Sequence, residues 1–100
     1  MSFSLDEINY ILGFENFKNQ QDKTLNFERI SIDSRNILPN DLFIAIQGNQ
    51  FDGHNFISNV IQKGVRAVII NRDMESLIPE NFQYWAVSDT KNAFQKIALF

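Results

Sequence analysis

Cysteine is absent from the 100-residue sequence, and histidine occurs only once. Without cysteine the chain has no disulfide framework, no thiol nucleophile and no zinc–thiolate site. A single histidine also excludes a metal site built from two imidazoles. The aspartates that follow the apolar runs are too far apart in the sequence to suggest a carboxylate cage for a metal ion. We therefore predict no metal site in this chain.

Long apolar runs and blocks of basic residues are also missing. The apolar runs are about five to seven residues long, whereas a helix that spans a bilayer needs about 20. Lys and Arg are scattered and the net charge is −3, which argues against a surface for nucleic acid or acidic lipid. The N-terminal sequence MSFSLDEI has no basic stretch before an apolar one, so no signal peptide is expected. We expect a soluble cytoplasmic domain without membrane insertion.

Apolar residues make up 44% of the chain, which is enough for one core in a single domain over residues 1–100. A capping-box sequence and the helical spacing of apolar residues predict a helix over residues 5–12. The same spacing predicts a helix between Asp52 and Gly64, and a final helix over about 89–100. The final helix shows no C-terminal cap signal, so we expect it to lead into a further domain.

Short apolar runs predict strands over residues 27–32, 42–46, 67–70 and 84–87, with a further short strand near 14–17 in a loop that reaches residue 26. Residues 73–83 are predicted to be a loop. The run at 42–46 is apolar throughout, as in a strand covered on both faces. With the helix that follows and the strand at 67–70, it forms a β-α-β unit whose strands are parallel by the right-handed crossover rule. The predicted fold is therefore α/β, a small mixed sheet flanked by helices.

Gly48 and Gly53 have the spacing of the glycines in a P-loop, and they stand between a predicted strand and a predicted helix. The Lys and Ser/Thr that should follow the second glycine are replaced by His54 and Asn55. A triphosphate would lack its cationic partner here and Mg²⁺ would lack a hydroxyl ligand, so an ATP site is excluded. Two interpretations stay open: the loop amides bind a smaller anionic ligand, or the glycines only supply unusual backbone angles.

The triplet Asp33-Ser34-Arg35 follows the first predicted strand of the central region. The Ser34 hydroxyl and the neighbouring amides can bind a phosphate oxygen, and Arg35 adds a planar guanidinium. The alternative is that Asp33 caps a turn while Arg35 pairs with a carboxylate at the surface. The spacing alone leaves both interpretations open.

The aromatic residues and the single histidine of this region have simple interpretations. Phe43, Phe51 and Phe56 are predicted to be core residues, although Phe51 lies in the loop and can instead stack on a base. His54 has no Ser or Cys nucleophile beside it in a triad-like motif. We predict that His54 makes a structural hydrogen bond near the helix start and is not a catalytic base.

The segments SIDSR at 31–35 and LPNDLFIAI at 38–46 resemble the N-terminal domain of the Mur ligases. The resemblance continues through FDGH at 51–54, AVII at 67–70 and VSDT at 87–90, and it covers about residues 27–98. These enzymes add amino acids to the UDP-linked precursor of peptidoglycan. The motifs are most similar to those of the members that add D-alanyl-D-alanine to UDP-N-acetylmuramoyl-tripeptide. The members that add the third amino acid are an alternative, as is a non-catalytic interaction module of similar fold.

The resemblance implies a three-domain enzyme in which ATP, with Mg²⁺, activates the carboxylate of the tripeptide in a central domain. This chain would be the N-terminal UDP-substrate-binding domain, with its last helix at about 89–100 leading into the missing ATPase domain. It would carry no catalytic residue and no cofactor of its own, and it would be inactive alone. We expect a monomer whose task is to hold the remote end of the substrate, so that the peptide carboxylate is oriented at the ATP site.

The resemblance also implies that two short segments bind the UDP moiety: Ile32, Ser34 and Arg35 after one strand, and Asn49, Gln50 and Phe51 after the next. Ser34 would face the ribose or the diphosphate, and Arg35 would supply charge to the diphosphate. The loop with Asn49 would lie against the uracil nucleotide, mainly through backbone contacts. These six residues are the predicted substrate site.

Overall fold

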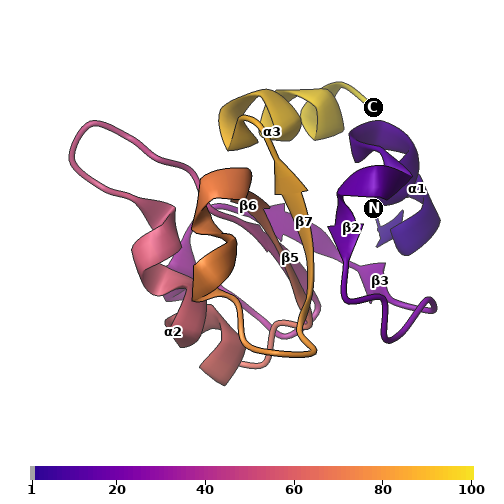
Figure 1. Ribbon diagram of the computed structural model, residues 1–100, viewed down its shortest axis with the longest axis horizontal. Helices are drawn as coiled ribbons and strands as arrows, with labels where there is room; N and C mark the ends of the chain where they lie inside the picture. The colour runs from indigo at the N-terminus through magenta and orange to yellow at the C-terminus, as the bar shows by residue number, and fades with distance from the viewer. Residues whose placement is uncertain (1) are drawn as a thin grey trace.

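The computed structural model describes residues 2–100 and shows a five-stranded mixed sheet with helices on both faces (Figure 1). The strand order is β2 (Phe17–Lys18), β7 (Gln83–Val87), β6 (Ala67–Asn71), β5 (Asp41–Ile44) and β4 (Arg29–Ser31). β2 runs antiparallel to β7, and the other neighbours are parallel. A two-stranded antiparallel sheet of β1 (Phe3–Ser4) and β3 (Asn26–Phe27) lies beside it. The predicted α/β class with a mixed sheet is confirmed.

Three α-helices and four 3-10 turns connect the strands in the described part of the chain. The α-helices are α1 (Leu5–Leu12), α2 (Ile57–Gln62) and α3 (Thr90–Leu99). The 3-10 turns are η1 (Phe14–Asn16), η2 (Ser34–Asn36), η3 (Gly53–Phe56) and η4 (Arg72–Leu77). The predicted parallel β-α-β unit is β5–α2–β6, and the sheet adds two further parallel pairs, β4–β5 and β6–β7. None of the helices within residues 2–100 has the length and apolarity to cross a membrane.

Local signals explain why α1 has the predicted bounds. The Ser4 Oγ accepts a hydrogen bond from the Glu7 N–H at 3.1 Å, and the Ser4 N–H donates to the Glu7 carboxylate at 2.9 Å. This capping box satisfies two backbone groups at the start of the helix. Gly13 ends the helix with a φ of 96°, a left-handed conformation that favours glycine.

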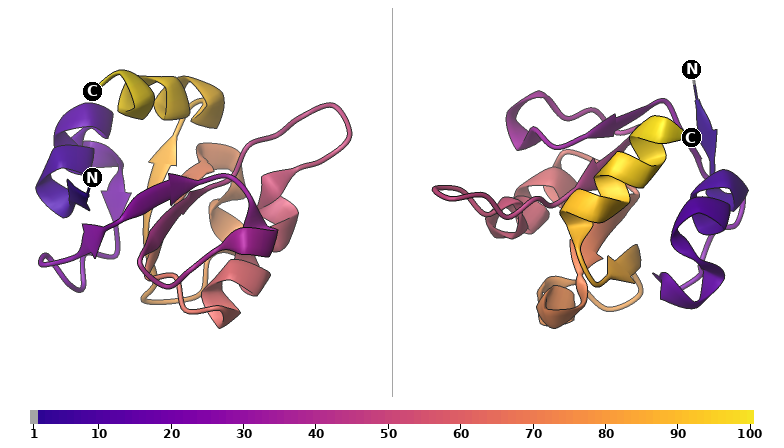
Figure 2. Two further views of the ribbon diagram at one scale, coloured as in Figure 1. Left: turned by 180° about the vertical axis from the view of Figure 1, so that it is seen from behind. Right: turned by 90° about the horizontal axis from the view of Figure 1, so that it is seen from above.

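The three inner strands of the main sheet, β5, β6 and β7, send alternate side chains to two apolar layers. Leu42 and Ile44 of β5 face the layer that contains α1 and α3, whereas Phe43 faces the layer that contains α2. Figure 2 shows α1 and α3 on the side of the sheet away from α2. Because both faces are covered, a continuously apolar run is the expected strand pattern. The prediction that the run at 42–46 forms a strand covered on both faces is confirmed, with all four β5 residues buried.

Several predicted bounds are wrong. The strand predicted over 27–32 is divided between the two sheets, because Phe27 pairs with Phe3 in the small sheet before the chain enters β4. Ile32 lies beyond β4 and is half exposed. The predicted loop over 73–83 contains most of η4 and the first residue of β7.

The start of the helix after Asp52 is also later than predicted. Asp52 caps η3 through the His54 N–H at 3.0 Å, so a 3-10 turn precedes the α-helix. Ile57 then begins α2, and Gly64 follows its end with a φ of 100°. The predicted elements keep their order along the chain, and β1, which pairs with β3, is an additional strand.

Candidate functional site

The carboxyl ends of β4, β5, β6 and β7 meet at one edge of the sheet, because these four strands are parallel. Ligands of open α/β sheets commonly bind at this edge. Two pockets open there, one between the segments that follow β4 and β5 and one over the ends of β5, β6 and β7. This edge of the sheet is therefore the candidate ligand-binding region.

The first pocket, which we name the β4–β5 groove, has a volume of about 590 Å³. Its lining residues come from the segment after β4 and from the loop and turn after β5: Ile32, Asp33, Ser34, Arg35, Ile46, Gly48, Phe51, Gly53 and Phe56. Four of the six predicted site residues are among them. Asn49 and Gln50 are exposed in the same loop but lie outside this lining.

One wall of the groove is η2, which the sequence predicts as a polar turn. The Asp33 carboxylate caps it by accepting from the Arg35 N–H at 2.9 Å and from the Asn36 side-chain amide at 3.0 Å. These hydrogen bonds, that from the Arg35 backbone first, lower the pKa of Asp33 below its usual range. The Arg35 side chain is 87% exposed and its Nε lies 3.2 Å from Asp33. The turn-capping interpretation therefore describes Asp33, and the exposed guanidinium still has free donors at the groove rim.

An ion pair between a half-exposed arginine and a buried carboxylate holds the connection between β4 and β5 that carries this wall. Arg29 donates from Nε and Nη2 to the two Asp41 oxygens at 2.9 and 2.6 Å, and Asp41 is only 1% exposed. Asp41 also accepts from the Leu38 N–H at 2.9 Å. The hydrogen bonds from Arg29 lower the pKa of Asp41, with a smaller contribution in the same direction from Leu38. No sequence pattern predicted this pair, because its members lie on adjacent parallel strands.

The other wall is the loop of residues 47–52, which projects from the body of the domain (Figures 1 and 2). Gln47 and Asp52 form an antiparallel bridge at its base, and the Gly48 N–H donates to the Phe51 carbonyl oxygen at 2.7 Å. The chain therefore doubles back on itself, and η3 follows in place of the α-helix start that a P-loop needs. Phe51 is 72% exposed, so its predicted place in the core is wrong, and the alternative that its ring stacks on a base stays a prediction.

The composition of the groove suits a ligand with a flat ring and an anionic group. Ile32, Ile46 and Phe56 supply apolar surface, and the exposed Phe51 ring offers a stacking face. The Ser34 hydroxyl makes no hydrogen bond to any residue in the described range 2–100, so it is available to a ligand. With Arg35 it places one hydroxyl and one cation at the polar end of the groove.

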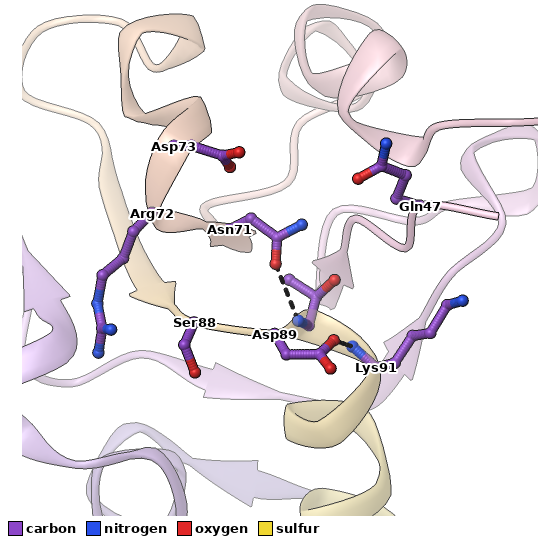
Figure 3. A pocket seen from close by; sticks show the side chains of 8 residues that line it. Gln47, Asn71, Arg72, Asp73, Ser88, Asp89 and Lys91 are labelled. Carbon is purple, nitrogen blue, oxygen red and sulfur yellow. Dashed lines mark hydrogen bonds between the residues drawn. The ribbon is translucent and has the colours of Figure 1, made fainter.

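The second pocket is polar, with a volume of about 600 Å³ (Figure 3). Its lining residues follow the carboxyl ends of three strands: Gln47, Asn71, Arg72, Asp73, Ser88, Asp89, Thr90 and Lys91. Figure 3 shows the two cations, Arg72 and Lys91, pointing to opposite sides. Two cations and two carboxylates balance in charge, and Asp89 is already used to cap α3 through the Lys91 N–H at 2.9 Å. The sequence analysis placed Ser88, Asp89 and Thr90 in the VSDT segment and assigned them no role in binding.

ATP and Mg²⁺, which the resemblance implies for the complete enzyme, do not fit the residues of this chain. The residue directly after Gly53 is His54 and not the lysine of a P-loop. Residues 2–100 also contain no group of three or more His, Asp or Glu side chains that could hold a metal ion. His54 is buried and has both ring nitrogens in hydrogen-bond contact, with Asp52 and with the Asn71 N–H. Its predicted structural hydrogen bond is confirmed. The β4–β5 groove remains the candidate binding site of this chain.

Comparison with known proteins identifies the family of the chain. The family model described as Mur ligase family, catalytic domain matches residues 26–98. A UDP-N-acetylmuramoyl-L-alanyl-D-glutamate–2,6-diaminopimelate ligase of Alkaliphilus metalliredigens is 38% identical over 76 residues, which are 76% of this chain and 15% of that protein. A UDP-N-acetylmuramoyl-tripeptide–D-alanyl-D-alanine ligase of Synechocystis sp. is 38% identical over 74 residues, which are 74% of this chain and 16% of that protein.

The fold is similar to that of a solved structure. The crystal structure of MurF from Acinetobacter baumannii matches with a TM-score of 0.81 and 25% identity, over 96% of this chain and 20% of that chain. The chain thus spans between 15% and 20% of the length of these relatives. The match over residues 26–98 includes both walls of the groove. The chain belongs to the Mur ligase family.

Proposed function

We propose that this chain is the N-terminal domain of a cytoplasmic, ATP-dependent ligase of peptidoglycan synthesis, and that it holds the UDP end of UDP-N-acetylmuramoyl-tripeptide. The complete ligase would add D-alanyl-D-alanine to that tripeptide. The observation that carries the proposal is the β4–β5 groove, which unites Ile32, Ser34, Arg35 and Phe51. These residues lie in the two segments that resemble substrate-binding segments of the family.

The proposed pose places the uracil ring between the apolar walls, against the Phe51 ring. The ribose and diphosphate then extend toward the Ser34 hydroxyl and the Arg35 guanidinium, which are donors suited to phosphate oxygens. Arg35 would share its donors between Asp33 and the diphosphate. Because the Asp33 carboxylate offsets part of its positive charge, Arg35 would attract the diphosphate less strongly than an unpaired arginine. Asn49 and Gln50 would contribute backbone groups from the loop beside Phe51.

The domain would act by orienting the UDP-linked substrate. Holding the UDP end fixes where the far end of the substrate lies, and a correctly placed carboxylate reacts with a lower entropic cost. ATP and Mg²⁺ would be held by other parts of the ligase, and the 100-residue chain alone is expected to be inactive. D-Alanyl-D-alanine would likewise contact only those other parts.

A second candidate function is the addition of the third amino acid to the same kind of precursor. The Alkaliphilus relative carries the name of such an enzyme, and it is as similar to this chain as the Synechocystis relative. The discriminating assay supplies the complete ligase and ATP with either UDP-muramoyl-tripeptide plus D-alanyl-D-alanine or UDP-muramoyl-dipeptide plus a diamino acid. Phosphate release with the first pair supports the proposal, and release with only the second pair supports the alternative.

The UDP site is tested by titrating UDP into the ¹⁵N-labelled chain and following its amide resonances. We expect weak binding, because contacts to the muramoyl peptide by other domains are missing. The amides of Ser34, Arg35 and residues 48–53 should shift, whereas inorganic pyrophosphate should affect only the polar end near Ser34. Shifts confined to the second pocket or to the face that carries α1 would refute the assignment.

The role of Ser34 is tested separately in the complete ligase. Ser34→Ala should raise the KM for the UDP precursor by about tenfold and leave the KM for ATP nearly unchanged, since one hydrogen bond to a charged group is lost. A larger change in the KM for ATP would contradict a role in binding the precursor.

A further inference from the structure

The single histidine of the chain joins two segments that are far apart in the sequence. His54 is 2% exposed. Its Nδ1 lies 2.6 Å from the Asp52 Oδ1, and its Nε2 accepts the Asn71 N–H at 3.0 Å. Asp52 is at the base of the projecting loop, whereas Asn71 is the last residue of β6. The ring therefore connects the loop to an interior strand of the sheet.

The hydrogen bonds determine which tautomer the ring adopts. A backbone N–H is only a donor, so the Nε2 that it contacts must be unprotonated. The proton of the neutral ring is then on Nδ1, where it is donated to Asp52. The same Asp52 oxygen also accepts the His54 N–H at 3.0 Å. The Asp52 Oδ1 thus accepts hydrogen bonds from both the ring and the backbone N–H of His54.

Few other contacts hold the loop of residues 47–52 to the rest of the domain. Residues 47–51 are exposed, and the backbone bonds at the base are the Gln47–Asp52 bridge and the hydrogen bond from the Gly53 N–H to the Ile46 carbonyl at 2.9 Å. Phe51 precedes Asp52 directly, so a small rotation at the base displaces the Phe51 ring by a larger distance. Asp52 thus lies between Phe51 and Gly53, two residues that line the β4–β5 groove.

The other end of the connection is held by the sheet and by the start of α3. Asn71 ends a strand that is paired on both sides, and its side-chain oxygen accepts the Thr90 N–H at 3.0 Å, at the start of α3. A hydrogen bond to this point positions the loop relative to the sheet and not only relative to its own neighbours.

We infer that His54 is a positioning residue for nucleotide binding, which sets the loop of residues 47–52 against the β4–β5 groove through Asp52 and Asn71. This inference rests on the proposed function, because the loop matters for the UDP moiety. His54 does not line the groove, so its effect on affinity is exerted through the loop.

Two substitutions separate the hydrogen bonds of the ring from its volume. His54→Phe retains an aromatic ring and removes both hydrogen bonds. His54→Gln places an amide near the position of Nε2, where its oxygen can again accept the Asn71 N–H. Ser4→Ala is the matched control, because it removes the α1 cap on the opposite side of the sheet and weakens the fold without contact to the loop.

The experiment measures UDP affinity and amide resonances of the labelled 100-residue chain. His54→Phe should raise the Kd for UDP by about tenfold, as expected for loss of a buried hydrogen bond, and should shift the amides of residues 48–52. His54→Gln should recover part of the affinity, and Ser4→Ala should leave the Kd unchanged. In the complete ligase, His54→Phe should raise the KM for the UDP precursor and leave kcat unchanged.

The outcomes separate this inference from the proposed function. If the unsubstituted chain does not bind UDP, the proposed function fails, and the loop amides alone decide the role of His54. If those amides and their hydrogen exchange are the same in His54→Phe as in the unsubstituted chain, the inference is overturned. If His54→Phe does not fold, His54→Asn replaces it, since its shorter amide can contact Asp52 but not Asn71. Unchanged loop amides in that variant would also overturn the inference.

Discussion

Gly53 packs directly against the backbone of Ile46. Its N–H donates to the Ile46 carbonyl oxygen at 2.9 Å, and a Cβ placed on Gly53 would lie 2.8 Å from the Ile46 nitrogen and 3.0 Å from the Ala45 Cα. Backbone atoms at that distance cannot turn aside as a flexible side chain can. Glycine is therefore required here for close approach, and this contact closes the projecting loop against the end of β5.

Gly53→Ala should displace the loop of residues 47–52. We expect a loss of about 1–3 kcal/mol in the free energy of unfolding, as for other overpacked sites, measured by urea denaturation. The Kd for UDP should rise, because Gly53 and Phe51 line the same groove. Gly48→Ala is the matched control for stability, since a Cβ there would meet only the Phe51 carbonyl oxygen at 3.4 Å. A greater loss of stability for Gly48→Ala would contradict the assigned role of Gly53.

Sequence patterns correctly predicted those helices and strands that are determined by neighbouring residues in the chain. The capping box predicted α1, and the continuous apolar run predicted a strand covered on both faces. The division of the strand predicted over 27–32 depends on the pairing of Phe27 with Phe3, across 24 positions of the chain. A pairing of that kind leaves no trace in the alternation of neighbouring residues, so only the structure could supply it.

The site could be predicted only in part for a similar reason. The resemblance pointed to Ile32, Ser34 and Phe51, which the structure brings to one groove. Ile46 and Phe56 resemble ordinary core residues in the sequence, and they become groove walls only because the loop doubles back between them. The positioning contacts of His54 depend on Asn71, 17 residues later, and no spacing rule predicts them.

Phe51→Ala should weaken UDP binding and leave the stability of the fold nearly unchanged. Phe51 is 72% exposed, so the free energy of unfolding should change by less than about 0.5 kcal/mol. Loss of a stacking ring should raise the Kd for UDP by about five- to a hundredfold, equivalent to about 1–3 kcal/mol. Phe14→Ala provides the comparison, because Phe14 is 63% exposed and lies outside the groove lining. Equal effects of the two substitutions on the Kd would refute stacking by Phe51.

Asp41→Asn should change how stability depends on pH. The pKa of Asp41 is lowered in the folded state, chiefly by hydrogen bonds from Arg29, so the folded state favours the ionised carboxylate. Its contribution is present above pH about 4 and is lost as the pH falls through the folded pKa. We expect Asp41→Asn to reduce the free energy of unfolding by about 2 kcal/mol at pH 7, measured by urea denaturation, and by less at pH 3. An equal reduction at both pH values would show that the charge of Asp41 is not responsible.

Asn9→Ala tests a buried polar contact inside the apolar layer under α1. Asn9 is 2% exposed, and its Oδ1 accepts the Nε1–H of the fully buried Trp85 at 2.8 Å. Alanine would leave the indole N–H without a partner, so the free energy of unfolding should fall by about 1–3 kcal/mol, measured by circular dichroism during urea denaturation. Trp85→Phe removes the donor instead, and the double variant Asn9→Leu with Trp85→Phe removes both polar groups. If the hydrogen bond matters, the double variant loses less stability than the sum of the Asn9→Leu and Trp85→Phe losses, because neither partner is then left unsatisfied. Additive losses would mean that the two side chains stabilise the core only by packing.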